Sequence, residues 1–120
     1  MVSVIGRPQT GKTSPVKTPS AALADMFKAL SDPIRLTILR LLRKGELCER
    51  DLADLMQMLP QALLAQHLTV LRECGLVRAS RDNSNVRLLY YSLDEEVLAE
   101  LARQCGRLFD TSPIGGREEF

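Results

Sequence analysis

Polar side chains that suit hydrogen bonding to a nucleic acid follow Pro60 in the chain. Gln and Arg can form paired hydrogen bonds with a base edge, and Thr and His can bond a base or a phosphate. The candidates for such contacts are Gln61, Gln66, His67, Thr69 and Arg72. Among them we expect Gln61 and Gln66 to contact bases.

His67 also fits a second role. Leu63 and Leu71 lie four residues to either side of it, which would place its ring at the edge of an apolar helix face. A histidine at such a boundary is often held by a hydrogen bond inside the protein. The sequence leaves both roles open for His67.

A second group of polar residues surrounds the segment 82–85. The runs 76–81 and 86–93, which contain Val, Leu and Tyr, predict two strands that this segment joins into a hairpin. Arg81, Asn83 and Arg87 lie near the tip of that hairpin and are further candidates for contacts with DNA.

Helices must hold these groups in place, and apolar residues spaced by three or four predict five of them. Ser20, the Ser31-Asp32 pair and Asp94 can cap three of these helices. Pro60 fits the first turn of the fourth, and Gly75 fits its end. The predicted helices run from 20 to 30, from 33 to about 45, from 48 or 49 to 56, from 60 to 74 and from 94 to 108.

The predicted fold class is mainly α with a small β-hairpin (α+β). Two short helices with a tight turn, followed by a two-stranded wing, are the pattern of a winged helix-turn-helix with five helices plus a wing. In that arrangement helix 60–74 can enter a major groove while the wing, 77–92, contacts the flanking backbone. The alternative is a winged module used for protein–protein contacts, because a fold does not fix a function. The basic bias of the helix and the wing favours DNA.

The chain has 120 residues, of which 45% are hydrophobic, and a formal net charge of +1. This size suits one domain, and so small a net charge neither favours nor excludes a polyanionic partner. Basic residues outnumber acidic ones in 1–20 and 59–93, whereas 94–120 is acidic. We expect a disordered basic arm at 1–19, a DNA-binding and dimerisation domain at 20–110 and a flexible tail at 111–120.

The three cysteines are scattered and odd in number, so they predict reduced thiols and no disulfide framework. The apolar run among the first residues is too short and too interrupted for a secretory signal. No apolar run approaches the roughly 20 residues that cross a bilayer. We therefore expect a soluble cytoplasmic protein with no membrane contact.

Residues 6–13 match the phosphate-binding loop pattern of nucleotide enzymes. Such a loop needs a helix directly after Lys12 and Thr13 to direct its amides at phosphate, but Pro15 and Pro19 interrupt one there. No parallel sheet is predicted after it. We therefore expect no enzyme activity, and a basic arm that either adds attraction to DNA or serves only solubility.

Three segments in order resemble the ArsR/SmtB family of transcriptional regulators: ALSDPIRLTIL at 29–39, ELCERDL at 46–52 and QHLTVLRECGLV at 66–77. The resemblance covers about residues 21–109 and implies a homodimer joined by the first and last helices. It also implies a repressor that binds a palindromic operator in double-stranded DNA and leaves it when an effector arrives. Gln61, His67 and Arg72 match the family's pattern, whereas Pro60 and Ala65 stand where serines are common.

The resemblance leaves the effector and any cofactor unknown. The family's zinc site on the last helix needs Asp, His and Glu ligands. The matching positions hold Glu95, Val97, Leu108 and Thr111. We therefore expect no zinc at that site. Arsenic sensing needs three thiolates near the third helix, where this chain offers Cys48 alone.

Cys48 and Cys105 are the candidates for binding an effector, which would be either a thiol-reactive compound or a metal or metalloid. Cys48 would lie at a helix N-terminus near Arg50, where a thiol can become reactive, although a weak helix cap explains it as well. Cys105 shares the apolar stripe of the last helix, where a symmetry mate can approach it, although packing also explains it. Cys74, just before Gly75, fits a small core residue.

Overall fold

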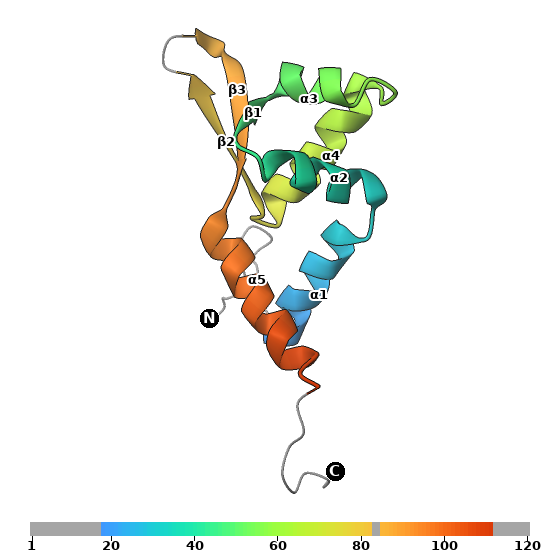
Figure 1. Cartoon of the computed structure of the whole chain (residues 1–120), viewed down its shortest axis with the longest axis vertical. Coiled ribbons are helices and arrows are strands. Elements are labelled where there is room, and N and C mark those ends of the chain that lie inside the picture. Colours follow the sequence, from blue (N-terminus) through green and yellow to red (C-terminus); the bar gives the residue numbers. More distant parts are fainter. Residues whose placement is uncertain (1–17, 83–84, 112–120) are drawn as a thin grey trace, which may run out of the picture.

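The computed structural model describes residues 18–82 and 85–111, and shows a mainly α fold with a small sheet (Figure 1). The helices are α1 (Pro19–Leu30), α2 (Pro33–Leu42), α3 (Glu49–Leu55), α4 (Gln61–Glu73) and α5 (Glu95–Leu108). The strands are β1 (Leu47–Cys48), β2 (Val77–Asp82) and β3 (Asn85–Leu93), and the hairpin of β2 and β3 is the wing. The predicted winged helix-turn-helix with five helices is therefore confirmed.

Side chains that accept backbone hydrogen bonds start α1 and α2. Thr18 Oγ1 accepts a hydrogen bond of 3.1 Å from an amide of the first turn of α1. The predicted cap at Ser20 is therefore wrong, because Pro19 already occupies the first turn, where its missing donor costs nothing. Asp32 Oδ1 accepts a hydrogen bond of 2.7 Å from the amide of Ile34, as expected for the start of α2.

α4 is one residue shorter at each end than predicted. Pro60 is the N-cap instead of the first helical residue, and its carbonyl accepts a hydrogen bond of 3.1 Å from the amide of Leu64. Gly75 follows the helix with a φ of +89°, in the left-handed region that favours glycine. This turn redirects the chain from α4 into the wing.

The sheet is antiparallel throughout and has the order β1-β3-β2. Tyr91, in the central strand β3, lies opposite Leu47 of β1 and Ala79 of β2. The sequence does not predict β1, because two residues are too few to show the alternation of a strand. Since β1 leads directly into α3, the sheet fixes the start of the helix that precedes α4.

The core lies between α2, α3, α4 and the sheet. Its buried members are Ile38, Leu42, Leu52, Leu64, Leu68, Leu71, Leu76, Val77, Tyr91 and Leu93. Full burial of one such leucine stabilises the fold by about 2 kcal/mol. Because three of the leucines recur along one face of α4, packing fixes which face of α4 points away from the protein.

α1 and α5 lie side by side at the end of the molecule opposite the wing tip (Figure 1). Met26, Val97 and Leu101 are half-buried against the edge of the core. No residue of α5 is buried in the single chain. The two helices therefore keep much of their apolar surface outside the core.

The phosphate-loop pattern at 6–13, most of the arm, Asn83 and the tail after Thr111 lie outside the described residues, so their roles stay predictions. No helix among the described residues is long and apolar enough to span a membrane.

Candidate nucleic-acid interface

α4 buries one face and exposes the other. Leu64, Leu68 and Leu71 are at most 1% exposed, and their spacing of four and three residues places them on one side of the helix. Four of the predicted contact residues are exposed: Gln61, Gln66, Thr69 and Arg72. The helical period therefore directs these polar groups to solvent.

Gln66 and Thr69 lie one turn apart on the outer side of α4. Both help to line a shallow surface hollow with Ala65 and Val70 of the same helix. The Thr69 hydroxyl donates a hydrogen bond of 3.0 Å to the carbonyl of Ala65, so its oxygen keeps its capacity to accept a further bond. Gln66 adds an amide that can both donate and accept.

Arg72 lies on the side of α4 that faces the wing. It lines a second hollow together with Thr69 and with Arg78 of β2. Burial raises the pKa of Tyr91 and the carboxylate of Glu49 raises it further, whereas the guanidinium of Arg72 lowers it. The Arg72 side chain therefore lies where α4 meets the sheet.

Gln61 lies on a different part of the surface from Gln66. It lines a hollow with Glu49 and Arg50 of α3 and with Leu89 of β3. Five residues along a helix correspond to a rotation of about 140°, so Gln61 and Gln66 point in different directions. Thr69 shares one hollow with Gln66 and another with Arg72, and these two residues lie about 120° apart around α4. Gln61 lines a separate hollow beside α3.

The wing residues are described only in part. Arg81 is exposed near the end of β2, next to an irregularity in the pairing with β3. Arg87 lies on β3, where only its backbone is described, and Asn83 lies outside the described residues. Arg78 is 70% exposed, and its guanidinium lies 3.9 Å from the carboxylate of Asp94.

The side chain of His67, in α4, is half-buried and contacts α2. Its Nδ1 lies 3.3 Å from a guanidinium nitrogen of Arg35, whose Nε donates a hydrogen bond of 2.7 Å to the carbonyl of Ala29. These contacts fit the predicted core-boundary role, and His67 also lines the same surface hollow as Gln66 and Thr69, so its predicted DNA contact stays a prediction. Sequence reasoning missed Arg35, because the motif that contains it gave no sign of a partner on α4.

The cysteines occupy different surroundings. Cys48 is buried, pairs with Tyr90 between β1 and β3, and forms the N-cap of α3, where its amide donates a bond of 3.3 Å to Asp51. Cys105 is half-buried on α5. Cys74 is half-buried, and its thiol donates a bond of 3.4 Å to the carbonyl of Leu71. Of the two candidate thiols, Cys105 is therefore the more accessible in the single chain.

The residues on α5 do not fit a family-type zinc site. Val97 and Leu108, at two of the four matching positions, carry no donor atom. Within 18–82 and 85–111, no group of three or more His, Cys, Asp or Glu side chains comes together in a way that could hold a metal ion.

Residues 32–79, from the cap of α2 to the first wing strand, match the ArsR family of bacterial regulatory proteins. An HTH-type transcriptional regulator of Methanocaldococcus jannaschii is 36% identical over 75 residues, which are 62% of this chain and 81% of that protein. The chain belongs to the ArsR family. This confirms the family that the three sequence segments indicate.

Two further ArsR-type relatives extend the comparison. The HTH-type transcriptional repressor SmtB of Mycobacterium tuberculosis is 32% identical over 80 residues, 67% of this chain but only 56% of the repressor. An ArsR-like transcriptional regulator from Rhodococcus has a TM-score of 0.62 and 33% identity, covering 74% of this chain and 80% of that one. The ArsR family and these relatives are transcriptional regulators and not enzymes.

Proposed function

We propose that this protein is a homodimeric transcriptional repressor that binds a palindromic operator in double-stranded DNA. The observation that carries the proposal is the exposed polar face of α4 beside the wing. Membership of the ArsR family and similarity to the SmtB repressor support it. A repressor acts where the chromosome lies, so the proposed location is the cytoplasm.

In this proposal α4 is the recognition helix and lies in the major groove. Gln66 and Thr69 face the bases, Gln61 contacts DNA at the N-terminal end of the helix, and Arg72 binds a base or a phosphate next to the wing. In the wing, Arg81 and Arg87 bind the flanking backbone together with Asn83. The two recognition helices of a dimer then enter major grooves about 34 Å apart, one helical turn of DNA.

The partner subunit in this proposal covers α1 and α5. A mainly apolar hollow lies between them, lined by Leu23, Met26, Val97 and Leu101 together with Glu100 and Gln104. Phe27, Leu108 and Phe109 are between 37% and 65% exposed in the single chain. Exposed apolar side chains gathered on two neighbouring helices are typical of an interface between subunits.

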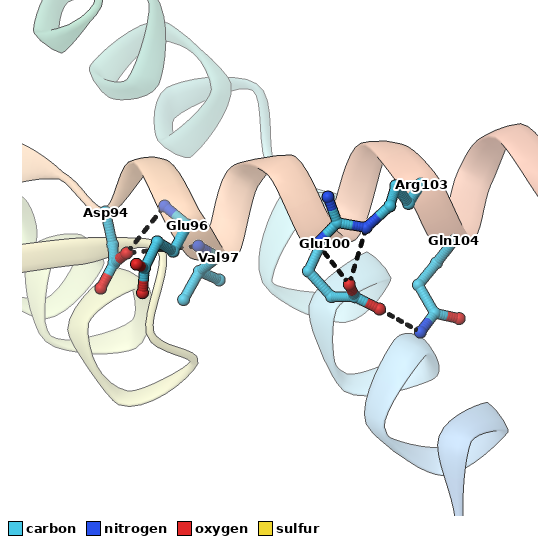
Figure 2. Close-up of polar contacts among 6 residues, drawn as sticks. All are labelled: Asp94, Glu96, Val97, Glu100, Arg103 and Gln104. Carbon is cyan, nitrogen blue, oxygen red and sulfur yellow. Dashed lines mark hydrogen bonds and ion pairs between the residues drawn. The ribbon is translucent and has the colours of Figure 1, made fainter.

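Polar groups on α5 border this hollow. Glu100 accepts hydrogen bonds of 3.0 and 2.7 Å from Arg103 and one of 2.8 Å from Gln104 (Figure 2). The side chains of Glu100 and Arg103 are 49% and 61% exposed. They therefore suit the polar rim that surrounds the apolar centre of a protein interface.

An effector that binds the free dimer more tightly than the DNA-bound dimer would release the repressor from DNA. The factor by which operator affinity falls is set by the ratio of the effector's affinities for these two states. The candidate effectors are a thiol-reactive compound and a metal or metalloid. Their candidate targets are Cys105 on the proposed dimer helix and Cys48 at the start of α3. The burial of Cys48 means that an effector must open the fold locally to reach it.

The test is fluorescence anisotropy with two labelled duplexes, one from upstream of the protein's own gene and one with the same bases scrambled. The proposal expects tighter binding to the first duplex, saturation at one dimer per site, and an affinity that falls steeply as salt rises. Equal and weak binding to both duplexes would contradict it and would favour the protein-contact alternative.

A further inference from the structure

Arg35 connects three helices through two hydrogen bonds. It belongs to the first turn of α2, and its Nε donates a bond of 2.7 Å to the carbonyl of Ala29 in α1. Another nitrogen of the same guanidinium lies 3.3 Å from His67 Nδ1 in α4. Ala29 is buried and Arg35 is half-buried, so the bond to α1 is partly shielded from water. One planar side chain therefore spans from the proposed dimer helix to the proposed recognition helix.

The chemistry of this contact determines where the imidazole carries its proton. A guanidinium has only donor groups and keeps its charge, so His67 Nδ1 must be the acceptor. This bond therefore requires a neutral ring that carries its proton on Nε2. If Nδ1 also gains a proton, two donors and two positive charges face each other, and the bond between α2 and α4 is lost.

Among the described residues, few charged groups lie around His67. From the start of α2, Asp32 acts on the ring electrostatically and opposes the repulsion from Arg35. The residues of α4 within one turn of His67 carry no ionisable side chain. Beyond Arg35, a hollow of about 520 Å³ between α1 and α4 is lined by Asp25, Lys28 and Glu73 among others. Arg35 is thus the cation in direct contact with the ring.

We propose that Arg35 is a positioning residue that orients α4 relative to α1 through neutral His67, so that operator affinity falls when His67 becomes protonated. This inference rests on the proposed role of α4 as the recognition helix. Because the spacing of two recognition helices in a dimer must match successive major grooves, a small rotation of α4 relative to the dimer helices weakens binding to both half-sites.

The chain is well suited to a test, because His67 is its only histidine. Histidine is the side chain that ordinarily changes charge between about pH 5 and 8. His67→Asn keeps an oxygen acceptor bonded to Cγ, as Nδ1 is, and cannot become protonated in this range. Asn and His have similar helix propensities, so the variant should preserve α4.

The experiment measures the operator affinity of untagged protein at about pH 7.5 and about pH 5.5. Acidification makes every variant more positive and strengthens DNA binding in general, so wild type is compared with His67→Asn at each pH. Relative to that variant, wild type should lose about five- to tenfold in affinity at the lower pH, the scale of one ordinary hydrogen bond. Identical pH profiles for the two proteins would overturn the proposal.

Two further measurements keep the outcome clear. Arg35→Met should weaken operator binding at both pH values. In the presence of Arg35→Met, the pH profiles with and without His67→Asn should be the same. Arg40→Met, which replaces an exposed arginine of the same helix, serves as the control. Nitrogen chemical shifts of the single imidazole should show the Nε2–H form near pH 7.5. An Nδ1–H form would overturn the link itself, without any DNA in the experiment. A wild type that does not prefer its operator would instead overturn the proposed function and the inference together.

Discussion

The backbone amide of Asp94 donates a hydrogen bond of 2.9 Å to the carbonyl of Leu76, and so joins the residue after the wing to the residue before it. The side chain of Asp94 starts α5, because its Oδ1 accepts bonds of 3.1 and 3.2 Å from the amides of Glu96 and Val97 (Figure 2). Its other oxygen lies 3.9 Å from Arg78 of β2. One residue thus fixes the base of the wing to the start of the proposed dimer helix.

Asp94→Ala should therefore destabilise the protein by about 1 kcal/mol, the usual cost of losing an N-cap side chain. Asp94→Asn keeps a capping oxygen and loses only the charge opposite the exposed Arg78, so its cost should be a few tenths of a kcal/mol. Urea unfolding at fixed protein concentration measures both. Equal losses for the two variants would mean that the charge, and not the cap, stabilises this junction.

A second prediction concerns acid. The hydrogen bond from the Ile34 amide, together with a weaker one from the amide of Arg35 and the nearby charges of His67 and Arg35, holds the pKa of Asp32 below its ordinary value of 3.8. A lowered pKa means that the folded state prefers the carboxylate. The stabilisation is therefore complete above pH 3.8 and is lost as the pH falls through the lower pKa of the folded state.

Asp32→Asn retains a capping oxygen without the charge. Wild type should be more stable than this variant at about pH 5, and the difference should shrink below about pH 4. Unfolding curves in urea across this range test the prediction. A difference that stays constant down to about pH 2.5 would contradict it.

The thiols should differ in reactivity. Because Cys48 is buried in the core between β1 and α3, iodoacetamide should alkylate it far more slowly in the folded protein than in urea. Cys105 is half-buried in the single chain and should be alkylated faster than Cys48. Mass spectrometry of peptides after a short exposure gives both rates. Rapid alkylation of Cys48 in the native state would contradict the buried position.

Serine variants test whether either thiol senses an effector. If a thiol-reactive effector releases the protein from DNA, Cys48→Ser or Cys105→Ser should abolish release by a mild oxidant while leaving operator affinity unchanged. If both variants release as wild type does, neither thiol is the sensor, and the effector acts on another part of the protein.

The fold could be predicted from the sequence because residues close together in the chain indicate each helix. The apolar period of α4, the caps at Asp32 and Asp94 and the stop at Gly75 are all signals within a few residues. The errors are also local. Ser20 resembles a cap, but Thr18 starts the helix, and β1 has too few residues to show a period.

The candidate site was less predictable, because its geometry depends on contacts between distant residues. Their spacing in the sequence already places Gln61 and Gln66 about 140° apart on one helix, but it does not show that α3 and β3 lie beside Gln61. The contact between Arg35 and His67 spans 32 positions along the chain and leaves no periodic signal. Packing of α2 against α4 creates it.

The measurement that tests the central claim most directly is the operator affinity of Gln66→Ala and Arg72→Ala, with scrambled DNA as the comparison. Both residues are exposed, so thermal stability and dimer content should stay near those of wild type. If α4 is the recognition helix, Gln66→Ala should weaken operator binding about tenfold with little effect on scrambled DNA, and Arg72→Ala should weaken operator binding at least as much. Wild-type operator affinity in both folded variants would show that α4 does not recognise DNA.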